Sequence, residues 1–478
     1  MGNKKNDIKN IYVLSPMQTM MLFNSMRNKD SLEDPYFRQC IMEISGDLKI
    51  ETLKDSFDFI IEKYDVLRSN FIYEKLKQPM QVVLTKRNID ISFDDLTNLN
   101  AKDKNSKIDA FIEKDKAFKF NLSKDLLMRV QVFKVDEEKF IMVLSNHHIS
   151  MDGWCVGIII KDLLNVYDDL SKGKEIEIGE VKQYDKYIEW LQKQNKKYAI
   201  DYWMEYLKDF NSNSNIPKLK SKEDGYDLKE ETYIFDKEIA SNLKRLANES
   251  EVTLSTVINI LWGFIVQAYN KSHDALFGMV VSGRGVPIEG IENMIGLFIN
   301  TVPMRVKCNE GKEFKEILKD VQNSIIMSEK YSFLLLTELF SEAKLKNDVI
   351  NHMAVVENFP TLDNLKNDYF SIENIYSKER TNYDFNVLFY PGDDMKIKFT
   401  YNKNVYKEKV IKKIMTHLKE AAASLCKDPD GTIRDSKFRN RLYDEINECI
   451  YDAEVCDMIK DKVILYNTVA IDDGEFDF

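Results

Sequence analysis

The chain has 478 residues, a length that predicts two or three domains rather than one. Its hydrophobic share of 44% permits large cores, and its net charge of -11 argues against a nucleic-acid-binding surface. No apolar stretch approaches the ~20 residues that span a bilayer, and the first ten residues lack an apolar signal region. We therefore expect a cytoplasmic protein with no membrane contact.

The predicted elements of the first half begin with a helix that carries Leu53, Phe57, Ile60 and Tyr64 at helical spacing. Apolar residues alternate with polar ones from 126 to 132, which predicts a half-buried strand, and residues 136–139 predict a turn. Residues 140–148 (FIMVLSNHH) form a run that favours a strand buried on both faces. A helix is then predicted over residues 152–170.

The second half begins after residues 171–183, a polar, glycine-containing stretch that predicts a linker. A long helical pattern follows over residues 184–207, and strands are predicted at 275–283 and 386–390. A late helix is predicted to stop at residues 428–431 (DPDG). These patterns predict an α/β protein with two lobes of similar style, residues 1–175 and 176–437.

Two further features of the composition concern the cysteines and the charge of the last residues. Its six cysteines are scattered and form no CxxC pair, so the sequence predicts neither a zinc ribbon nor a disulfide framework. Residues 438–478 hold four basic and eleven acidic side chains, a net charge of -7, which leaves -4 for the other 437 residues. We interpret 438–478 as an acidic, linker-like tail.

Two of the five histidines, His147 and His148, are adjacent at the end of a predicted strand. Adjacent strand residues point to opposite faces, so the pair is poorly placed to bind one ion, and no metal site is predicted. The chain has no G-x-S-x-G nucleophile elbow, and Cys155 falls within the predicted helix. On these residues alone two interpretations stay open. Either His148 faces a cavity and transfers protons near neutral pH, or both histidines merely cap a buried strand.

The segment HHISMDGW (147–154) resembles the HHxxxDG core motif of condensation domains of nonribosomal peptide synthetases. Further segments resemble the other core motifs of that family, in the family's order: LSPMQTMMLF (14–23), YDVLRSNF (64–71), YDKYIEWLQKQ (184–194), IGLFINTVPMR (295–305) and TNYDFNV (381–387). The resemblance covers about residues 10–437. The chain departs from the family pattern at Met20, at residues 63–65 and at Val302, none of which touches the HHxxxDG core.

The resemblance implies a fold of two chloramphenicol-acetyltransferase-like lobes, arranged as a V around a central tunnel. It also implies peptide-bond formation in secondary metabolism, antibiotic biosynthesis included. The α-amine of an acceptor aminoacyl thioester attacks a donor aminoacyl or peptidyl thioester. Both thioesters are carried on phosphopantetheine arms, one of a donor and one of an acceptor peptidyl carrier protein. No cofactor of its own is implied. We expect a monomeric domain, with an adjacent adenylation domain in a parent synthetase.

The same resemblance assigns roles to individual residues. His148 lies beside the attacking amine, as a general base or as a group that holds the amine and stabilises charge. His147 is structural, Asp152 pairs with Arg284 from the other lobe, and Gly153 lines the channel. Further candidate tunnel or motif residues are Ser15, Gln18, Arg68, Trp154, Asn300 and Asn386.

Two related interpretations compete with condensation. An epimerization domain shares the fold, but Gly153-Trp154 favours condensation. The other is a catalytically inactive platform that recruits carriers or enzymes. A heterocyclization domain is excluded, because it has aspartates in place of His147 and His148. The chain has no adenylation motif and no carrier-protein serine motif, so we expect partners in trans or on a larger synthetase.

Overall fold

A computed structural model of the chain describes residues 7–27, 34–176, 179, 181–218, 225–308, 312–345, 349–357, 365–379, 381 and 383–434. The acidic tail predicted at 438–478 lies outside these residues. The chain divides into two compact units, each assembled from three separate segments. The first unit comprises Met1–Lys196, Ser282–Asn300 and Phe359–Asn382, and the second comprises Lys197–Val281, Thr301–Asn358 and Tyr383–Phe478.

This division differs from the contiguous lobes 1–175 and 176–437 that the sequence predicted. The first unit continues to Lys196 and incorporates two segments that come more than 80 residues later in the chain. One of them supplies β12, which pairs antiparallel with β2 of the first unit. The other buries Met294 and Phe298 in the core of that unit. Pairing and burial between segments so far apart in sequence leave no local signal in a hydrophobicity pattern.

The first unit contains a five-stranded sheet in the order β12-β2-β7-β6-β5 and a three-stranded sheet in the order β1-β4-β3. Its strands are β1 (Ile8–Val13), β2 (Phe37–Gly46), β3 (Ser69–Ile72), β4 (Met80–Leu84), β5 (Ile91–Asp95), β6 (Met128–Asp136), β7 (Lys139–His147) and β12 (Phe370–Glu379). Its helices are α1 (Pro16–Arg27), α2 (Ile50–Lys63), η2 (Asp65–Arg68), α3 (Ala101–Ala117), α4 (Gly153–Ser171), α5 (Asp185–Gln192) and η3 (Ile291–Asn293).

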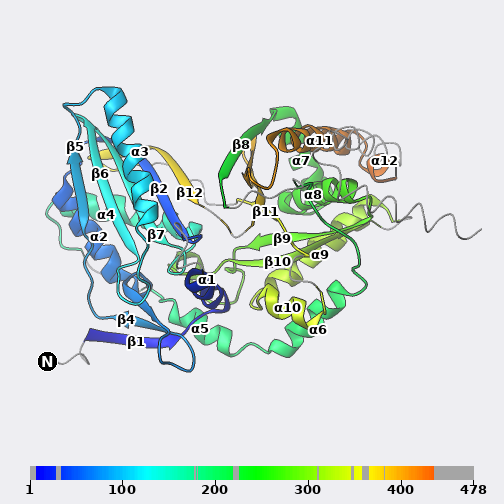
Figure 1. Ribbon diagram of the computed structural model, residues 1–478, viewed down its shortest axis with the longest axis horizontal. Coiled ribbons are helices and arrows are strands. Elements are labelled where there is room, and N and C mark those ends of the chain that lie inside the picture. Colours follow the sequence, from blue (N-terminus) through cyan, green and yellow to red (C-terminus); the bar gives the residue numbers. More distant parts are fainter. Residues whose placement is uncertain are drawn as a thin grey trace, which may run out of the picture. The chain divides into compact units, whose positions relative to one another are not determined.

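Strand β7 runs through the middle of the larger sheet and is buried on both faces over most of its length, as its apolar run predicted. Met142 and Leu144 belong to the core that α2 and α4 contribute to. Val143 instead packs in a separate cluster with Ile112 of α3. Helices α2 and α4 lie against each other along the sheet (Figure 1). The sheet thus holds the end of β7 between two helical layers.

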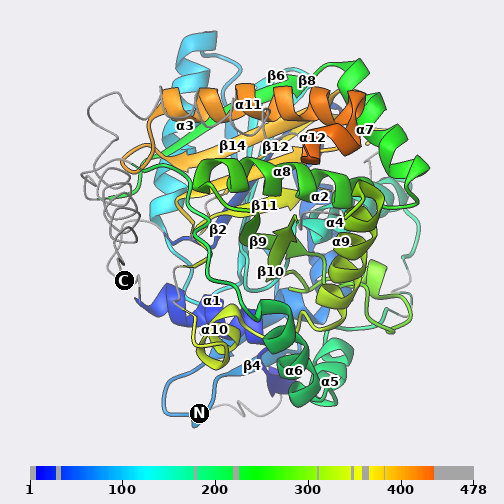
Figure 2. The same cartoon turned by 90° about the vertical axis from the view of Figure 1, so that its right-hand side faces the viewer.

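The second unit is built on a six-stranded sheet in the order β10-β9-β11-β13-β14-β8. Its strands are β8 (Leu228–Phe235), β9 (Asp274–Val281), β10 (Asn300–Lys307), β11 (Met353–Val356), β13 (Phe385–Tyr390) and β14 (Met395–Asn402). Its helices are α6 (Lys196–Leu207), α7 (Lys237–Glu249), α8 (Leu254–Asn270), α9 (Phe314–Lys330), α10 (Leu336–Glu342), α11 (Glu408–Lys427) and α12 (Pro429–Arg434). Helices α7, α8, α9 and α11 form one layer beside this sheet (Figure 2).

Helix α8 is the most deeply buried helix of this layer, with Val257 through Ala268 all buried. Among the described residues, no single helix has the length and apolar character to cross a membrane. Helices α7 and α8 meet that test only as a pair, and they are bent by 112° at their junction.

The helical pattern predicted over residues 184–207 is two helices, not one. Helix α5 ends at Gln192 and α6 begins at Lys196, and the interval coincides with the passage of the chain from the first unit to the second. A single straight helix would keep the apolar faces of both segments on one axis, and both would then have to pack in one core. The break at Lys193–Asn195 allows Ile188 to be buried in one unit and Trp203 in the other.

Candidate active site

The two adjacent histidines lie where β7 ends. His147 is the last residue of the strand and is fully buried, whereas His148 begins the following loop and is partly exposed. The loop ends at Asp152, and α4 begins at Gly153. The predicted difference in exposure between the two histidines is present in the structure.

Backbone hydrogen bonds hold the loop on either side of His148. The N–H of His148 donates to the carbonyl of Tyr36 at 2.8 Å. The N–H of Ile149 donates to Nδ1 of His147 at 3.1 Å, and Oγ of Ser150 donates to the His147 carbonyl at 2.9 Å. Because Nδ1 of His147 accepts a hydrogen bond, the proton of its neutral ring must lie on Nε2. The buried histidine therefore acts as a brace for the loop.

Nε2 of His147 faces Asp34, whose Oδ2 lies 3.4 Å away, and Ser25, whose Oγ lies at the same distance. Asp34 also accepts hydrogen bonds from the N–H of Tyr36 at 2.9 Å and from Ser25 Oγ at 3.2 Å. Burial would raise the pKa of the Asp34 carboxyl, but the hydrogen bonds from His147, Tyr36 and Ser25 outweigh it and lower the pKa below its ordinary value.

A pH dependence of stability follows from Asp34. Because its pKa is lower in the folded state, Asp34 stabilises the fold above about pH 4, and this contribution is lost as the pH falls through the lowered folded value. We expect Asp34→Asn to reduce the free energy of unfolding at pH 7 and to flatten its decline between about pH 4 and pH 2. Urea unfolding at pH 7, 4 and 3 measures both effects. If the free energy of unfolding declined equally in both proteins from pH 4 to pH 3, this assignment would be wrong.

Asp152 is fully buried and, although it occupies the N-cap position of α4, its side chain makes no capping bond to that helix. Its Oδ1 accepts from Nη2 of Arg284 at 3.2 Å and from Sγ of Cys155 at 3.2 Å. Its Oδ2 accepts from the N–H of Phe298 at 3.0 Å, and its own N–H donates to the carbonyl of Gly296 at 3.1 Å. Asp152 therefore fastens the segment 282–300 to the start of α4.

Arg284 is almost as buried as its partner, with 5% of its side chain exposed. Its Nη1 donates to the carbonyls of Ile291 at 2.6 Å and Met294 at 2.9 Å, and its guanidinium lies 4.2 Å from the ring centre of Phe298. The predicted pair with Asp152 is thus present, but both residues belong to the first compact unit. The expectation of a bridge between lobes needs correction, because the segment carrying Arg284 packs into the same unit as the histidine loop.

Three of the sequence motifs, residues 147–154, 184–194 and 295–305, contact one another around Asp152. The ring of Tyr184, from the segment 184–194, packs edge-on against Phe298 and its hydroxyl donates to the carbonyl of Leu297 at 2.6 Å. A side chain at Gly296 would place its Cβ 2.1 Å from that ring. At Gly283, where φ is +65°, a Cβ would lie 1.9 Å from the carbonyl oxygen of Phe298. Glycine at both positions allows the approach that brings Phe298 to Asp152.

Gly153 and Trp154 line a pocket of about 130 Å³ on the α4 side of the sheet, together with Arg38, Asn146 and Ile375. The walls come from β2, β7, β12 and the first turn of α4, all within the first unit. The indole N–H of Trp154 donates to the carbonyl of Glu292 at 3.0 Å. Gly153 therefore borders open space beside the loop, while the tunnel expected from the family stays a prediction.

Several other predicted site residues have buried side chains. Ser15 precedes α1 and is hydrogen-bonded to Gln18 in its first turn, and Gln18 also contacts the histidine loop at Ile149. Asn386, on β13 of the second unit, donates to Oγ1 of Thr400 at 3.0 Å. Asn300 begins β10 and is buried.

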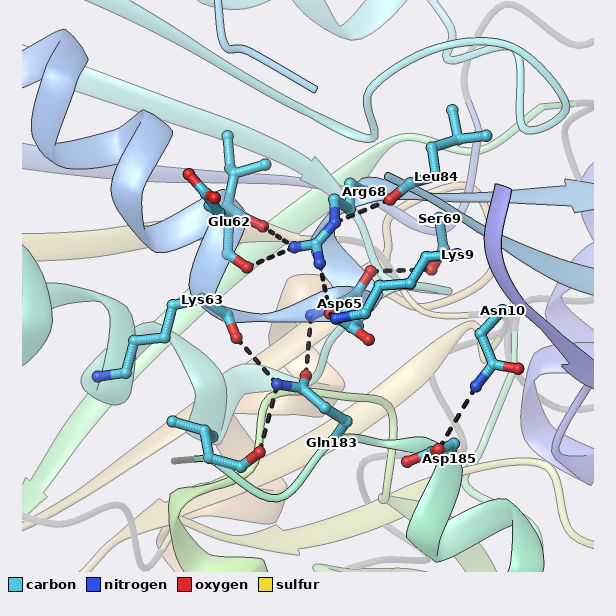
Figure 3. A network of polar contacts seen from close by, with 12 residues as sticks. Lys9, Asn10, Glu62, Lys63, Asp65, Arg68, Ser69, Leu84, Gln183 and Asp185 are labelled. Carbon is cyan, nitrogen blue, oxygen red and sulfur yellow. Dashed lines mark hydrogen bonds and ion pairs between the residues drawn. The ribbon is translucent and has the colours of Figure 1, made fainter. Parts of the chain in front are cut away.

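Arg68 belongs to a polar network at the end of α2 (Figure 3). Its Nη1 donates to the carbonyls of Ile61 and Glu62, and its Nη2 contacts Oδ1 of Asp65 at 2.5 Å. Gln183, at the end of the predicted linker, donates to the carbonyl of Lys63 and accepts from the N–H of Asp65. With 4% of its surface exposed, Arg68 satisfies helix-end carbonyls rather than facing a channel.

Cys155 is the thiol nearest to the histidines in sequence, and it is not suited to nucleophilic attack. It is fully buried in the first turn of α4. Burial raises the pKa of its thiol above the ordinary range, and the charge of Asp152 adds to that effect. Among the residues that the structure describes, no cluster of three or more His, Cys, Asp or Glu side chains is arranged to hold a metal ion.

The sequence analysis did not single out Asp34, Tyr36 or Tyr184. The Asp34-Pro35 dipeptide is a turn signal that could have marked the start of β2. Tyr36 acts on His148 through its backbone carbonyl, so its side chain carries no signal for that contact. Tyr184 opens a segment that the family resemblance identified, but its packing partner lies more than 100 residues away in the chain.

A family model described as the condensation domain matches residues 8–442 of this sequence. The chain belongs to the condensation-domain family. Gramicidin S synthase 2 of Brevibacillus brevis is 36% identical over 440 residues, which cover 90% of this chain and 10% of that protein. Surfactin synthase subunit 3 of Bacillus subtilis (strain 168) is 39% identical over 435 residues, covering 90% of this chain and 34% of that one.

Solved structures show the same fold. The first condensation domain of the calcium-dependent antibiotic synthetase, in complex with a substrate analogue, matches 90% of this chain and 99% of its own, with a TM-score of 0.74 at 15% identity. The predicted mixed α/β, chloramphenicol-acetyltransferase-like fold is therefore confirmed, whereas the V arrangement stays a prediction. This condensation domain spans between a tenth and a third of the length of the two synthases compared above.

Proposed function

We propose that this condensation domain forms a peptide bond between two thioesters carried by separate carrier proteins. The α-amine of an acceptor aminoacyl thioester attacks the carbonyl carbon of a donor aminoacyl or peptidyl thioester. The new C–N bond forms as the donor's C–S bond breaks, and the amine proton leaves while the donor's thiolate takes up a proton. The product is a peptidyl thioester on the acceptor carrier and a free thiol on the donor arm.

The observation that carries the proposal is the combination of a fixed backbone and partial exposure at His148. The ring of His147 is buried and braces the loop, so His148 is the histidine left to meet a substrate. A neutral imidazole next to the attacking amine can accept its proton or stabilise the charge that develops on nitrogen. Holding two tethered reactants together supplies much of the remaining acceleration.

The partners we propose are a donor and an acceptor carrier protein, each with a phosphopantetheine arm. The support comes from the family and from the relatives, which are peptide synthases much longer than this chain. One structural relative is a four-domain nonribosomal peptide synthetase that matches 91% of this chain with a TM-score of 0.74. The condensation domain itself supplies histidine and backbone groups, and the reactive thioesters arrive with the carriers.

The proposal is tested by mixing the purified chain with a donor-loaded and an acceptor-loaded carrier and identifying the acyl group on each carrier. We expect a dipeptide on the acceptor carrier and a free thiol on the donor carrier. An acceptor whose α-amine is replaced by hydrogen is the matched control and should give no amide. An inverted but unextended aminoacyl group would instead indicate epimerization. Unchanged carriers would indicate a recruitment platform.

A further inference from the structure

Gln18 is fully buried in the first turn of α1, yet its side chain reaches the loop that carries His148. Its Nε2 donates to the carbonyl of Ile149 at 3.1 Å and to Oε1 of Gln81 at 2.9 Å. Its Oε1 accepts from the N–H of Ser15 at 2.9 Å, which together with the bond from the Gln18 N–H to Ser15 Oγ forms a capping box. Both amide hydrogens and the amide oxygen of Gln18 are thus in use.

Through this contact Ile149 is held at both of its backbone polar groups. Its N–H donates to Nδ1 of His147, and its carbonyl accepts from Gln18. The N–H of His148 is held by the carbonyl of Tyr36. Because these groups are buried, a shift of the loop would break a hydrogen bond without offering water in its place. Hydrogen bonds with His147, Gln18 and Tyr36 therefore fix the backbone that carries the His148 imidazole.

Gln81 extends the connection into the three-stranded sheet. It lies on β4, is fully buried, and its Nε2 donates to the hydroxyl of Tyr12 on β1 at 2.8 Å and to Oγ of Ser69 on β3 at 2.9 Å. A chain of side-chain hydrogen bonds thus runs from all three strands through Gln81 and Gln18 to the Ile149 carbonyl. Buried networks in which each member is bonded hold their parts rigidly.

We propose that Gln18 is a positioning residue for condensation, which fixes the backbone of Ile149 and through it the place of the His148 imidazole. The inference rests on the proposed function, in which His148 acts on the acceptor amine. Gln18 is buried and does not touch a substrate. Because a displacement of about 1 Å at a reacting group can cost 10²-fold in rate, its loss acts on the chemical step rather than on carrier binding.

The first arm of the test compares Gln18→Met with Gln131→Met. Gln131 is a buried amide on β6 of the same unit, whose Nε2 donates to Asp94 Oδ2 and to the carbonyl of Val132, both at 3.2 Å. We expect Gln18→Met to lower kcat by about 10- to 100-fold with the KM for either carrier changed by less than about twofold. Gln131→Met should leave kcat unchanged. Equal losses of kcat in the two variants would overturn the proposal.

Gln18→Glu supplies a second variant that keeps the capping oxygen for Ser15. The new carboxyl faces the oxygens of Ile149 and Gln81, so burial and these acceptors favour its protonated form, which again donates one hydrogen bond. The ratio of its kcat to that of the wild type should rise about tenfold as the pH is lowered from 8 to 6. A ratio that stays constant or falls over that interval would argue against positioning.

The positioning role of Gln18 can also be tested without peptide-bond formation. Hydrogen–deuterium exchange of the substrate-free chain is followed in peptides that cover His148 and Ile149, and in peptides from β6 as an internal reference. We expect Gln18→Met to speed exchange in the loop by about tenfold or more without changing β6. Unchanged loop exchange would overturn the proposal even if the wild type forms peptides. Faster exchange would support it even if the wild type proved inactive, so the two proposals fail separately.

Discussion

Replacing His148 with alanine is expected to slow peptide-bond formation by about 10²- to 10⁴-fold while the chain stays folded. The backbone N–H of His148 donates to the carbonyl of Tyr36, and alanine keeps that hydrogen bond. His148 is partly exposed, so removal of its imidazole should cost little core packing. The rate constant is measured in single turnover with both carriers loaded.

The control for this substitution is His273→Ala, which removes an exposed histidine of the second unit. It should leave the rate constant and the melting temperature unchanged. Circular dichroism and urea unfolding of His148→Ala establish that its fold is retained. A folded His148→Ala protein that condenses at the rate of the His273→Ala control would rule out a chemical role for His148.

The second large effect is expected at the buried ion pair. Asp152→Asn should lower the free energy of unfolding by about 3–5 kcal/mol, because Arg284 keeps its charge in a site with 5% of its side chain exposed. An asparagine also places an NH2 group against the N–H of Phe298 or the guanidinium of Arg284, both of which are donors. We expect a reduced yield of soluble protein together with reduced activity.

A double-mutant cycle with Arg284→Gln separates the pair from its surroundings. Urea unfolding of both single variants and the double variant gives the coupling free energy, which should be at least about 1 kcal/mol. The double variant should lose less stability than the sum of the two single losses, because it leaves no uncompensated charge. Strict additivity would mean that the two side chains stabilise the fold independently, contrary to their 3.2 Å contact.

The parts of this molecule that local periodicity governs were predictable from sequence. The opposite environments of His147 and His148 follow from the alternation of side chains along a strand. The apolar run 140–147 became β7, buried on both faces, and the amphipathic stretch around Phe57 became α2. The family fold was predictable from the ordered motifs, since each preserves residues whose contacts the fold requires.

Other features depend on contacts that no local pattern encodes. The ring of Tyr184 lies over Gly296, and the carboxyl of Asp152 binds the N–H of Phe298, across more than 100 residues of sequence. For that reason Arg284 was assigned to the wrong unit, although its partner was identified. The role of Gln81 was likewise invisible, because a polar residue facing inward in a strand resembles a solvent-facing one until the strand's neighbours are known.

Whether this condensation domain catalyses amide formation between carriers is decided by counting turnovers. Both loaded carriers are supplied in about tenfold excess over the chain, and the intact mass of the acceptor carrier is followed with time. We expect the acceptor carrier to gain the mass of the donor acyl group in amounts that exceed the chain several-fold, while the donor carrier loses the same mass. An acceptor carrier whose mass never changes, with both thioesters still intact, would contradict it.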